Sequence, residues 1–280
     1  MTSLMSVKSP VDNSISSLSE RDLFYPKMLF DPRTYAQERS DLALPYELKN
    51  ICSPLNQWET GFDIIYQENK LYNLLLATQV LDGLLIKPGE TFSLWKNLGT
   101  KRLINTYREG ISLINGRLAI TPAGGMTVMS TLLFRLFLHS PLTLIERHGQ
   151  TLRDTRPNPS DGLELIGTEA MVVPGRWDLK VRNDSRETFQ IRLDVDAENL
   201  WGYLFVDKNL GGGYALRNGE CRYYRRMDSI IEQVSLYQQK RGGHRADLLS
   251  EKLLFINQCR IDYELPPETA VMETRRVAVS

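Results

Sequence analysis

The sequence is poor in cysteine. Its three cysteines, Cys52, Cys221 and Cys259, are spread over 280 residues, and no two of them form a CxxC pair. The odd number and wide spacing argue against a disulfide framework and against the usual zinc-ligand spacings. We therefore expect no metal, and we expect no cofactor. Free thiols are typical of a reducing compartment, which agrees with an expected cytoplasmic location.

The chain also lacks an excess of either charge and a long apolar run. Lys and Arg total 34, as do Asp and Glu, so the basic surplus typical of nucleic-acid binding is absent and we expect no nucleic-acid partner. The most apolar stretch, residues 128–145, is interrupted by Arg135, His139 and Pro141. We therefore expect no membrane span, which needs about 20 predominantly apolar residues.

What remains is the composition of a globular chain, with 42% hydrophobic residues. Residues 1–22 are polar and rich in serine, which predicts a flexible N-terminal arm. Residues 23–265 are expected to form a single α+β domain, mostly β over 170–265. Residues 266–280 are expected to be a loose tail.

Two segments have helical patterns. Apolar residues at helical spacing predict an amphipathic helix over 69–85, in which Leu71, Leu74, Leu75, Thr78 and Leu81 share a face. A turn around Pro88 follows it. Residues 126–139 are almost wholly apolar and predict a buried helix, and residues 142–146 predict a short buried strand.

The C-terminal half has the period-two pattern of strands. Segments 177–181, 189–195 and 200–206 predict an antiparallel meander. Residues 220–239 are polar and strand-like, and residues 253–265 alternate in a way that would close the sheet. The expected fold is a helical N-terminal half packed on a mostly antiparallel sheet.

Possible chemistry begins at the start of the second helix. Gly124 and Gly125 allow a sharp turn and close approach to a ligand or another chain segment. The free N–H groups and the dipole of the following helix favour an anion or an oxyanion there, and Thr127 lies on its first turn. The alternative is that the glycines form only a loop and that Thr127 or Ser130 caps the helix.

A second group follows the predicted strand at 142–146. Arg147 could hold an anion and His148 could act as a general base. The alternative is that His148 is a structural histidine.

Several spaced motifs occur in order between residues 45 and 265. They are PGETFS (88–93), AGGMT (123–127), HSPLTLIERH (139–148), GTEA (167–170) and DLKVRND (178–184). Together they resemble the VanW family, which is named from vancomycin-resistance gene clusters. The resemblance names no reaction, but it implies a link to the cell envelope, the antibiotic response or a specialised-metabolite cluster.

The sequence departs from the family pattern at its most reactive positions. The family has approximately GGG-x-Cys-Gln followed by Glu-Arg-His-x-His. Here Thr127 and Val128 stand at the Cys and Gln positions, and Gln150 stands at the second His position, while Arg147 and His148 match. Losing a thiol and an imidazole together is what an inactivated site would show, because a threonine hydroxyl is far less acidic than a thiol.

The family order of Cys, His and an acidic residue is similar to that of transglutaminase- and papain-like folds, a likeness at the level of the fold. It implies a candidate catalytic set and a candidate ligand pocket. These are Thr127, His148 and Glu169 for the catalytic set, and Gly124, Gly125, Arg147 and Gln150 for the pocket.

Three functions stay open, and the sequence does not decide whether the protein is an enzyme. One is a non-catalytic accessory protein that binds a small molecule, a peptidoglycan precursor or a protein partner. Another is an acyl- or amide-processing enzyme that uses Thr127 with His148. The third is an interaction protein whose exposed strand edges and polar 220–245 region form the interface.

Overall fold

Helix α5 (Met126–Leu138) is the centre of the molecule. The structure is a computed structural model that describes residues 30–55, 61–99, 106–114, 117–154, 165–242 and 247–273. The predicted arm at 1–22 lies outside these ranges. Nine of the 13 residues of α5 are buried, as an apolar helix requires. The predicted buried helix over 126–139 is confirmed.

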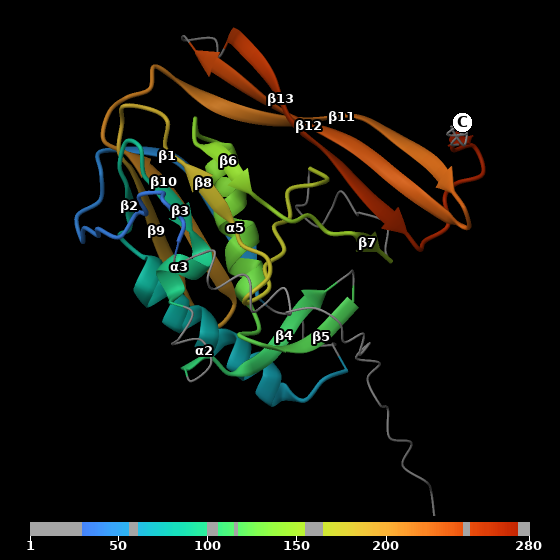
Figure 1. Ribbon diagram of the computed structural model, residues 1–280, viewed down its shortest axis with the longest axis horizontal. Coiled ribbons are helices and arrows are strands. Elements are labelled where there is room, and N and C mark those ends of the chain that lie inside the picture. Colours follow the sequence, from blue (N-terminus) through green and yellow to red (C-terminus); the bar gives the residue numbers. More distant parts are fainter. Residues whose placement is uncertain are drawn as a thin grey trace, which may run out of the picture.

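A four-stranded antiparallel sheet lies against α5 (Figure 1). A Cβ on Gly202 would lie 2.5 Å from Cδ2 of Leu132, so the helix can pack closely only because this position has no side chain. The predicted strands at 189–195 and 200–206 are confirmed as neighbours. In order, the strands are β1 (Tyr46–Pro54), β10 (Asn199–Val206), β9 (Phe189–Val195) and β2 (Leu85–Ile86).

The first strand of the predicted meander belongs to another sheet. Strand β8 (Lys180–Arg182) pairs with β3 (Thr91–Ser93) and β6 (Thr143–Glu146), not with β9. The chain after β8 is held elsewhere, because the backbone N–H of Asn183 donates to Glu90 O and Asn183 O accepts from Gly89 N. The meander prediction was therefore wrong at its first step.

Helix α2 (Ile64–Leu81) starts and faces differently from the prediction. The Asp63 side chain accepts a hydrogen bond from Ile65 N and caps it, so the helix begins five residues before 69. Leu75, predicted to face the core, is 41% exposed. The buried face instead contains two polar residues, and consists of Lys70, Asn73, Leu74, Ala77 and Leu81.

The N-terminal half is not mainly helical, so that expectation was wrong. Besides α2, α5 and the short α3 (Leu94–Leu98), it contains β1, β2, β3 and the hairpin of β4 (Glu109–Ile114) and β5 (Arg117–Pro122). Strand β1 has the mixed sequence YELKNICSP and is exposed or half-buried along its length, so it has no clear apolar alternation. The molecule is sheet-rich, with several antiparallel sheets.

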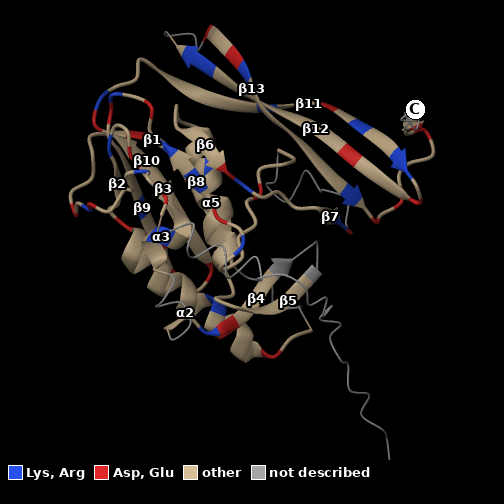
Figure 2. Ribbon diagram, in the orientation of Figure 1, with Lys and Arg blue, Asp and Glu red and all other residues tan. Residues whose placement is uncertain are grey.

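A long twisted ribbon of three strands extends from this body (Figure 1). It consists of β11 (Gly212–Arg226), β12 (Ser229–Gly242) and β13 (Asp247–Ile261), with both charges interspersed along it (Figure 2). The strand-like stretch at 220–239 thus contains a turn, at which Met227 has a φ of 53°. Two short strands pair in parallel with its edges: β7 (Leu152–Arg153) with β13, and β14 (Val271–Glu273), from the segment predicted to be loose, with β11.

No helix in the described part of the chain is both long and apolar enough to cross a membrane. All three cysteines are free thiols.

Candidate functional site

The two glycines before α5 pack against other parts of the chain. A Cβ on Gly124 would lie 2.1 Å from the carbonyl carbon of Gly110 in β4. Gly125, the N-cap residue, has a φ of 93°, and a Cβ there would lie 2.9 Å from Cγ of Lys70. The Asn73 amide donates to Gly124 O. The close approach expected of these glycines is therefore made to β4 and α2.

Thr127 lies on the first turn of α5 and is half-buried. Its carbonyl oxygen accepts a hydrogen bond from the Ser130 hydroxyl, which also donates to Ala170 O at 2.5 Å. The N-cap has no side-chain hydrogen bond, so neither Thr127 nor Ser130 caps the helix as the alternative interpretation required. The structure places the hydroxyl of Thr127 at the helix start, as the sequence predicts.

His148 lies beyond the end of β6, with its side chain 35% exposed. Its ring stacks on Trp177, with centroids 5.2 Å apart and an interplanar angle of 13°. Its Nε2 lies 3.2 Å from Oε1 of Glu146. Its backbone carbonyl accepts from Met171 N, which places the imidazole beside the 168–173 segment.

Glu146 connects His148 to two residues that sequence reasoning did not select. Its Oε2 accepts from Lys180 Nζ at 2.8 Å, and its Oε1 accepts from Asp178 N. Burial acts to raise the pKa of Glu146, but hydrogen bonds from His148 and Lys180 outweigh it and lower the pKa to about 2. We call Glu146, His148 and Lys180, with Trp177, the His148 cluster.

Asp178 lies behind this cluster and is fully buried. Its carboxylate accepts hydrogen bonds from the Ser93 hydroxyl and from the backbone N–H groups of Trp95 and Leu179. Burial raises its pKa to about 6, although the Ser93 hydrogen bond and the Lys180 charge oppose the shift.

This raised pKa predicts a pH-dependent stability. The folded state binds a proton at pH values where the unfolded carboxyl, with a pKa near 3.8, does not. The contribution is therefore complete below the unfolded pKa and lost as the pH rises through about 6. Urea unfolding at pH 7.5 and 5 should show the wild type gaining about 1 kcal/mol relative to Asp178→Asn at the lower pH. Parallel pH dependences of the two proteins would contradict this assignment.

Arg147 points away from the His148 cluster, and its guanidinium is fully engaged within the protein. Nε donates to Glu169 O at 2.7 Å, Nη2 to Gly167 O at 2.8 Å, and Nη1 to Oδ1 of Asn257 at 3.1 Å. Burial lowers its pKa to about 10. The rings of two phenylalanines lie near the guanidinium carbon, Phe134 at 5.4 Å and Phe255 at 4.8 Å.

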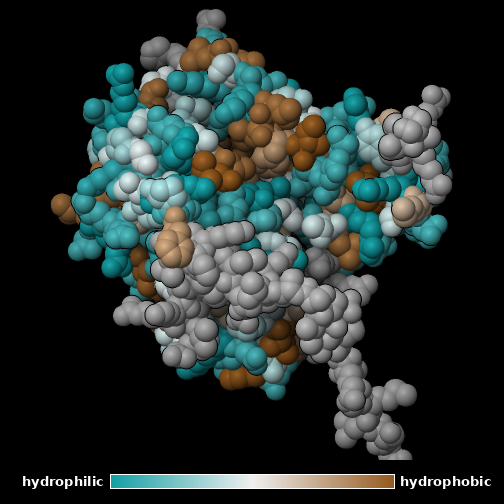
Figure 3. Space-filling model, viewed as in Figure 1, coloured by the Kyte–Doolittle hydropathy of each residue, from teal (hydrophilic) through white to brown (hydrophobic). Residues whose placement is uncertain are grey.

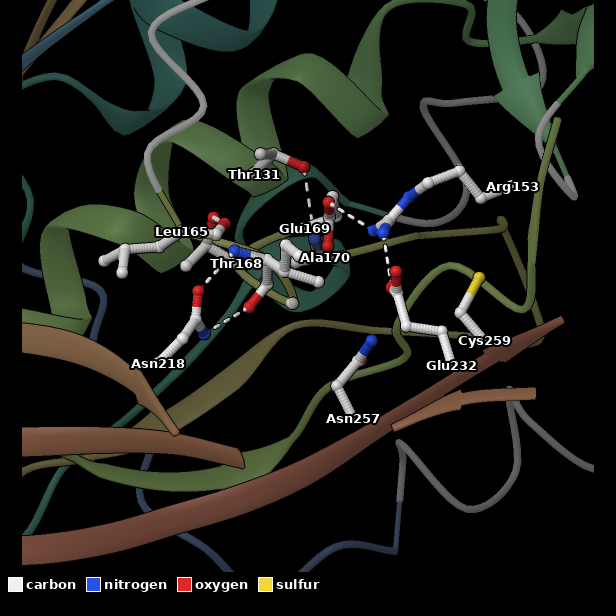
Figure 4. Close-up of polar contacts among 12 residues, drawn as sticks. Thr131, Arg153, Leu165, Thr168, Glu169, Ala170, Asn218, Glu232, Asn257 and Cys259 are labelled. Carbon is white, nitrogen blue, oxygen red and sulfur yellow. Dashed lines mark hydrogen bonds and ion pairs between the residues drawn. The ribbon is translucent and has the colours of Figure 1, made fainter. Parts of the chain in front are cut away.

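Glu169 belongs to a buried ion network (Figure 4). Its Oε1 lies 3.5 Å from Nη2 of Arg153, and Nη1 of Arg153 lies 2.6 Å from Oε1 of Glu232. The Tyr263 hydroxyl donates to the other oxygen of Glu232. We call Arg147, Arg153, Glu169 and Glu232 the ion network; it joins the body to the ribbon.

The candidate catalytic and pocket residues therefore do not form one site. Gln150 is buried, and Glu169 pairs with arginines rather than with His148. Among the described residues, no hydrogen bond joins the Thr127 hydroxyl to an imidazole, and no three His, Cys, Asp or Glu side chains are grouped to hold a metal. The pairing of Glu146 with His148 could have been noticed, because side chains two apart in an extended chain point to the same side, and His148 comes soon after the strand.

Comparison with known proteins supports the resemblance seen in the motifs. A family model described as VanW like protein matches residues 69–205. The chain is 40% identical over 253 residues to the Vancomycin B-type resistance protein VanW of Enterococcus faecalis (strain ATCC 700802 / V583), an alignment that covers 90% of this chain and 91% of that protein. No solved structure matches, so the likeness to transglutaminase- and papain-like folds stays a prediction. With the motifs, the family-model match and this identity, the chain belongs to the VanW-like family.

Proposed function

We propose that this protein is a non-catalytic accessory of the response to vancomycin-type antibiotics. It acts by binding a peptidoglycan precursor or another small ligand, and not by acyl transfer at Thr127. The link to vancomycin rests on the name of its relative in Enterococcus faecalis.

The observation that carries the proposal is the engagement of His148. A threonine hydroxyl needs a base in contact to become a nucleophile. Here Nε2 of His148 lies beside the Glu146 carboxylate, and the ring stacks on Trp177. The exposed third of the His148 side chain is open to a ligand, while the Lys180 ammonium behind it is buried and paired with Glu146 and Asp178. A partly exposed imidazole stacked on a tryptophan suits a ligand that carries a carboxylate and a flat group.

Thr127→Ala separates binding from catalysis. We expect this variant to restore the vancomycin susceptibility phenotype of a deletion strain as fully as the wild type does. The purified wild type should form no adduct with a serine- and threonine-directed acyl probe, as judged by mass spectrometry of its peptides.

A second substitution provides the contrast. His148→Ala should weaken binding of a synthetic peptidoglycan-precursor pentapeptide about tenfold, measured by calorimetry, while Thr127→Ala leaves it unchanged. A probe adduct on Thr127, or loss of complementation by a folded Thr127→Ala, would instead support the acyl- or amide-processing enzyme.

We further propose a cytoplasmic location. The three free thiols support it, because a reducing compartment maintains them. In the complemented strain the tagged protein should be recovered in the cytoplasmic fraction, and recovery from the culture medium would contradict the proposal.

A further inference from the structure

Strand β13 has a neighbouring strand on only one side along most of its length. Strand β12 pairs with it from Asp247 to Ile261, whereas β7 pairs with its other edge only at Arg260 and Ile261. In the described ranges, no other strand covers that outer edge. An open edge of this kind presents unpaired N–H and C=O groups to which another strand can bind.

The open edge of β13 carries large aliphatic side chains among its charged ones. Natural edges are commonly protected by charges, proline or bulges; β13 has no proline, and the extra residues at its two bulges are the apolar Leu249 and Leu254. On β13, four large aliphatic side chains are between 45% and 59% exposed, namely Leu248, Leu249, Leu253 and Ile256. Figure 3 shows apolar side chains gathered on the face of the molecule seen in Figure 1, near β6 and β13.

A cavity of about 140 Å³ opens between β6 and β13. Strand β6 is itself the last strand of its sheet, so two strand edges border the cavity. Apolar cavities of this size hold a group about as large as benzene, which corresponds to one bulky side chain. The apolar walls come from α5, β6 and β13, and include Phe134, Phe137, Leu138, Leu142, Leu144 and Leu254.

Lys252 supplies a positive charge at this cavity. It is exposed, lines the cavity and has no hydrogen bond or ion pair with any residue that the structure describes. The neighbouring polar side chain, Gln238, uses its amide nitrogen to donate to Leu138 O and Ser140 O. The charge that this surface would complement is therefore negative.

We propose that the outer edge of β13 binds an extended peptide segment of a partner protein. The segment pairs with the edge as an added strand, places one bulky apolar side chain in the cavity and sets a carboxylate beside Lys252. Main-chain hydrogen bonds supply affinity in this mode, and pockets for single side chains supply specificity. None of the residues that line the cavity belongs to the His148 cluster, so the inference goes beyond the proposed function and does not depend on it.

The test uses fluorescein-labelled octapeptides and the full-length protein. Each peptide has a background of alternating threonine and valine. One position is replaced by phenylalanine or alanine and a second position by glutamate or lysine, and the set contains every combination of the two positions. Fluorescence anisotropy should select peptides with phenylalanine and glutamate. The best of them should lose binding when alternate backbone nitrogens are methylated, because added-strand pairing needs those N–H groups.

Two variants test the contacts of the peptide. Lys252→Glu should weaken binding of the glutamate peptide about tenfold and strengthen that of its lysine counterpart by a similar factor. Leu254→Arg, checked for folding by circular dichroism, should remove the preference for phenylalanine over alanine. Arg226→Glu is the matched control: it makes the same charge change on an exposed residue of the ribbon, beside the β11–β12 turn, and should leave both affinities within twofold.

Three results would overturn the inference. They are no binding by any peptide of the set at 1 mM, equal binding by the methylated peptide, and no change of charge preference in Lys252→Glu. Light scattering that reveals a dimer dissociated by Lys252→Glu would also overturn it, because a second copy of the chain would then occupy the edge.

Discussion

Arg153→Met is expected to lower the free energy of unfolding by about 3–5 kcal/mol, the cost of breaking a buried ion pair from one side. The side chains of Arg153 and Glu232 are 7% and 1% exposed, and their charged atoms lie 2.6 Å apart. Without the guanidinium, the Glu232 carboxylate keeps only the Tyr263 hydroxyl among the partners described here. Urea unfolding followed by circular dichroism measures the loss.

A surface ion pair on the same ribbon provides the control. The charged atoms of Arg222 and Glu220 lie 2.9 Å apart, but their side chains are 55% and 72% exposed. Arg222→Met should change stability little, because water screens such a pair. In Arg153→Met, amide hydrogen exchange should also accelerate in β12 and β13 more than in α5, since the ion network joins the ribbon to the body. Equal effects of the two substitutions would show that the ion network does not hold the ribbon.

Gly124→Ala is expected to cost about 3 kcal/mol of stability, at the upper end for an overpacked position. Its Cβ would lie 2.1 Å from the carbonyl carbon of Gly110 and 2.3 Å from its Cα, so backbone must move. Thermal and urea unfolding of the variant measure the loss.

Gly213→Ala is the matched control, because an added Cβ there meets nothing within 4 Å. It should leave stability nearly unchanged. This comparison also separates two roles of the glycine turn. If Gly124 serves mainly to admit a ligand, Gly124→Ala should weaken ligand binding while unfolding like the wild type, contrary to our expectation.

The parts of the fold that the sequence predicted well are those with one uniform pattern. Helix α5 is apolar throughout, and β9 and β10 alternate and lie next to each other in the chain. The face of α2 was predicted wrongly because Lys70 and Asn73 are buried. Their polar groups are satisfied by backbone carbonyls of Leu55 and Gly124, far away in the sequence. No local pattern reveals such partners.

The same reasoning explains what was predictable in the candidate site. The position of Thr127 at a helix start and of His148 after a strand followed from local patterns. The other residues of the His148 cluster did not, apart from Glu146, because Lys180 reaches Glu146 only through the pairing of β6 with β8. The surroundings of Glu169 were equally hidden, since Glu232 comes from the ribbon.

The pairing of β1 with β10 has a consequence for synthesis of the chain. Residues 46–54 cannot find their partner until residues 199–206 have left the ribosome. Until then the apolar α5 has no complete sheet to cover it, and closing so long a loop is slow. The nascent chain therefore passes through a long aggregation-prone stage, in which a chaperone that shields α5 would raise the yield of native protein.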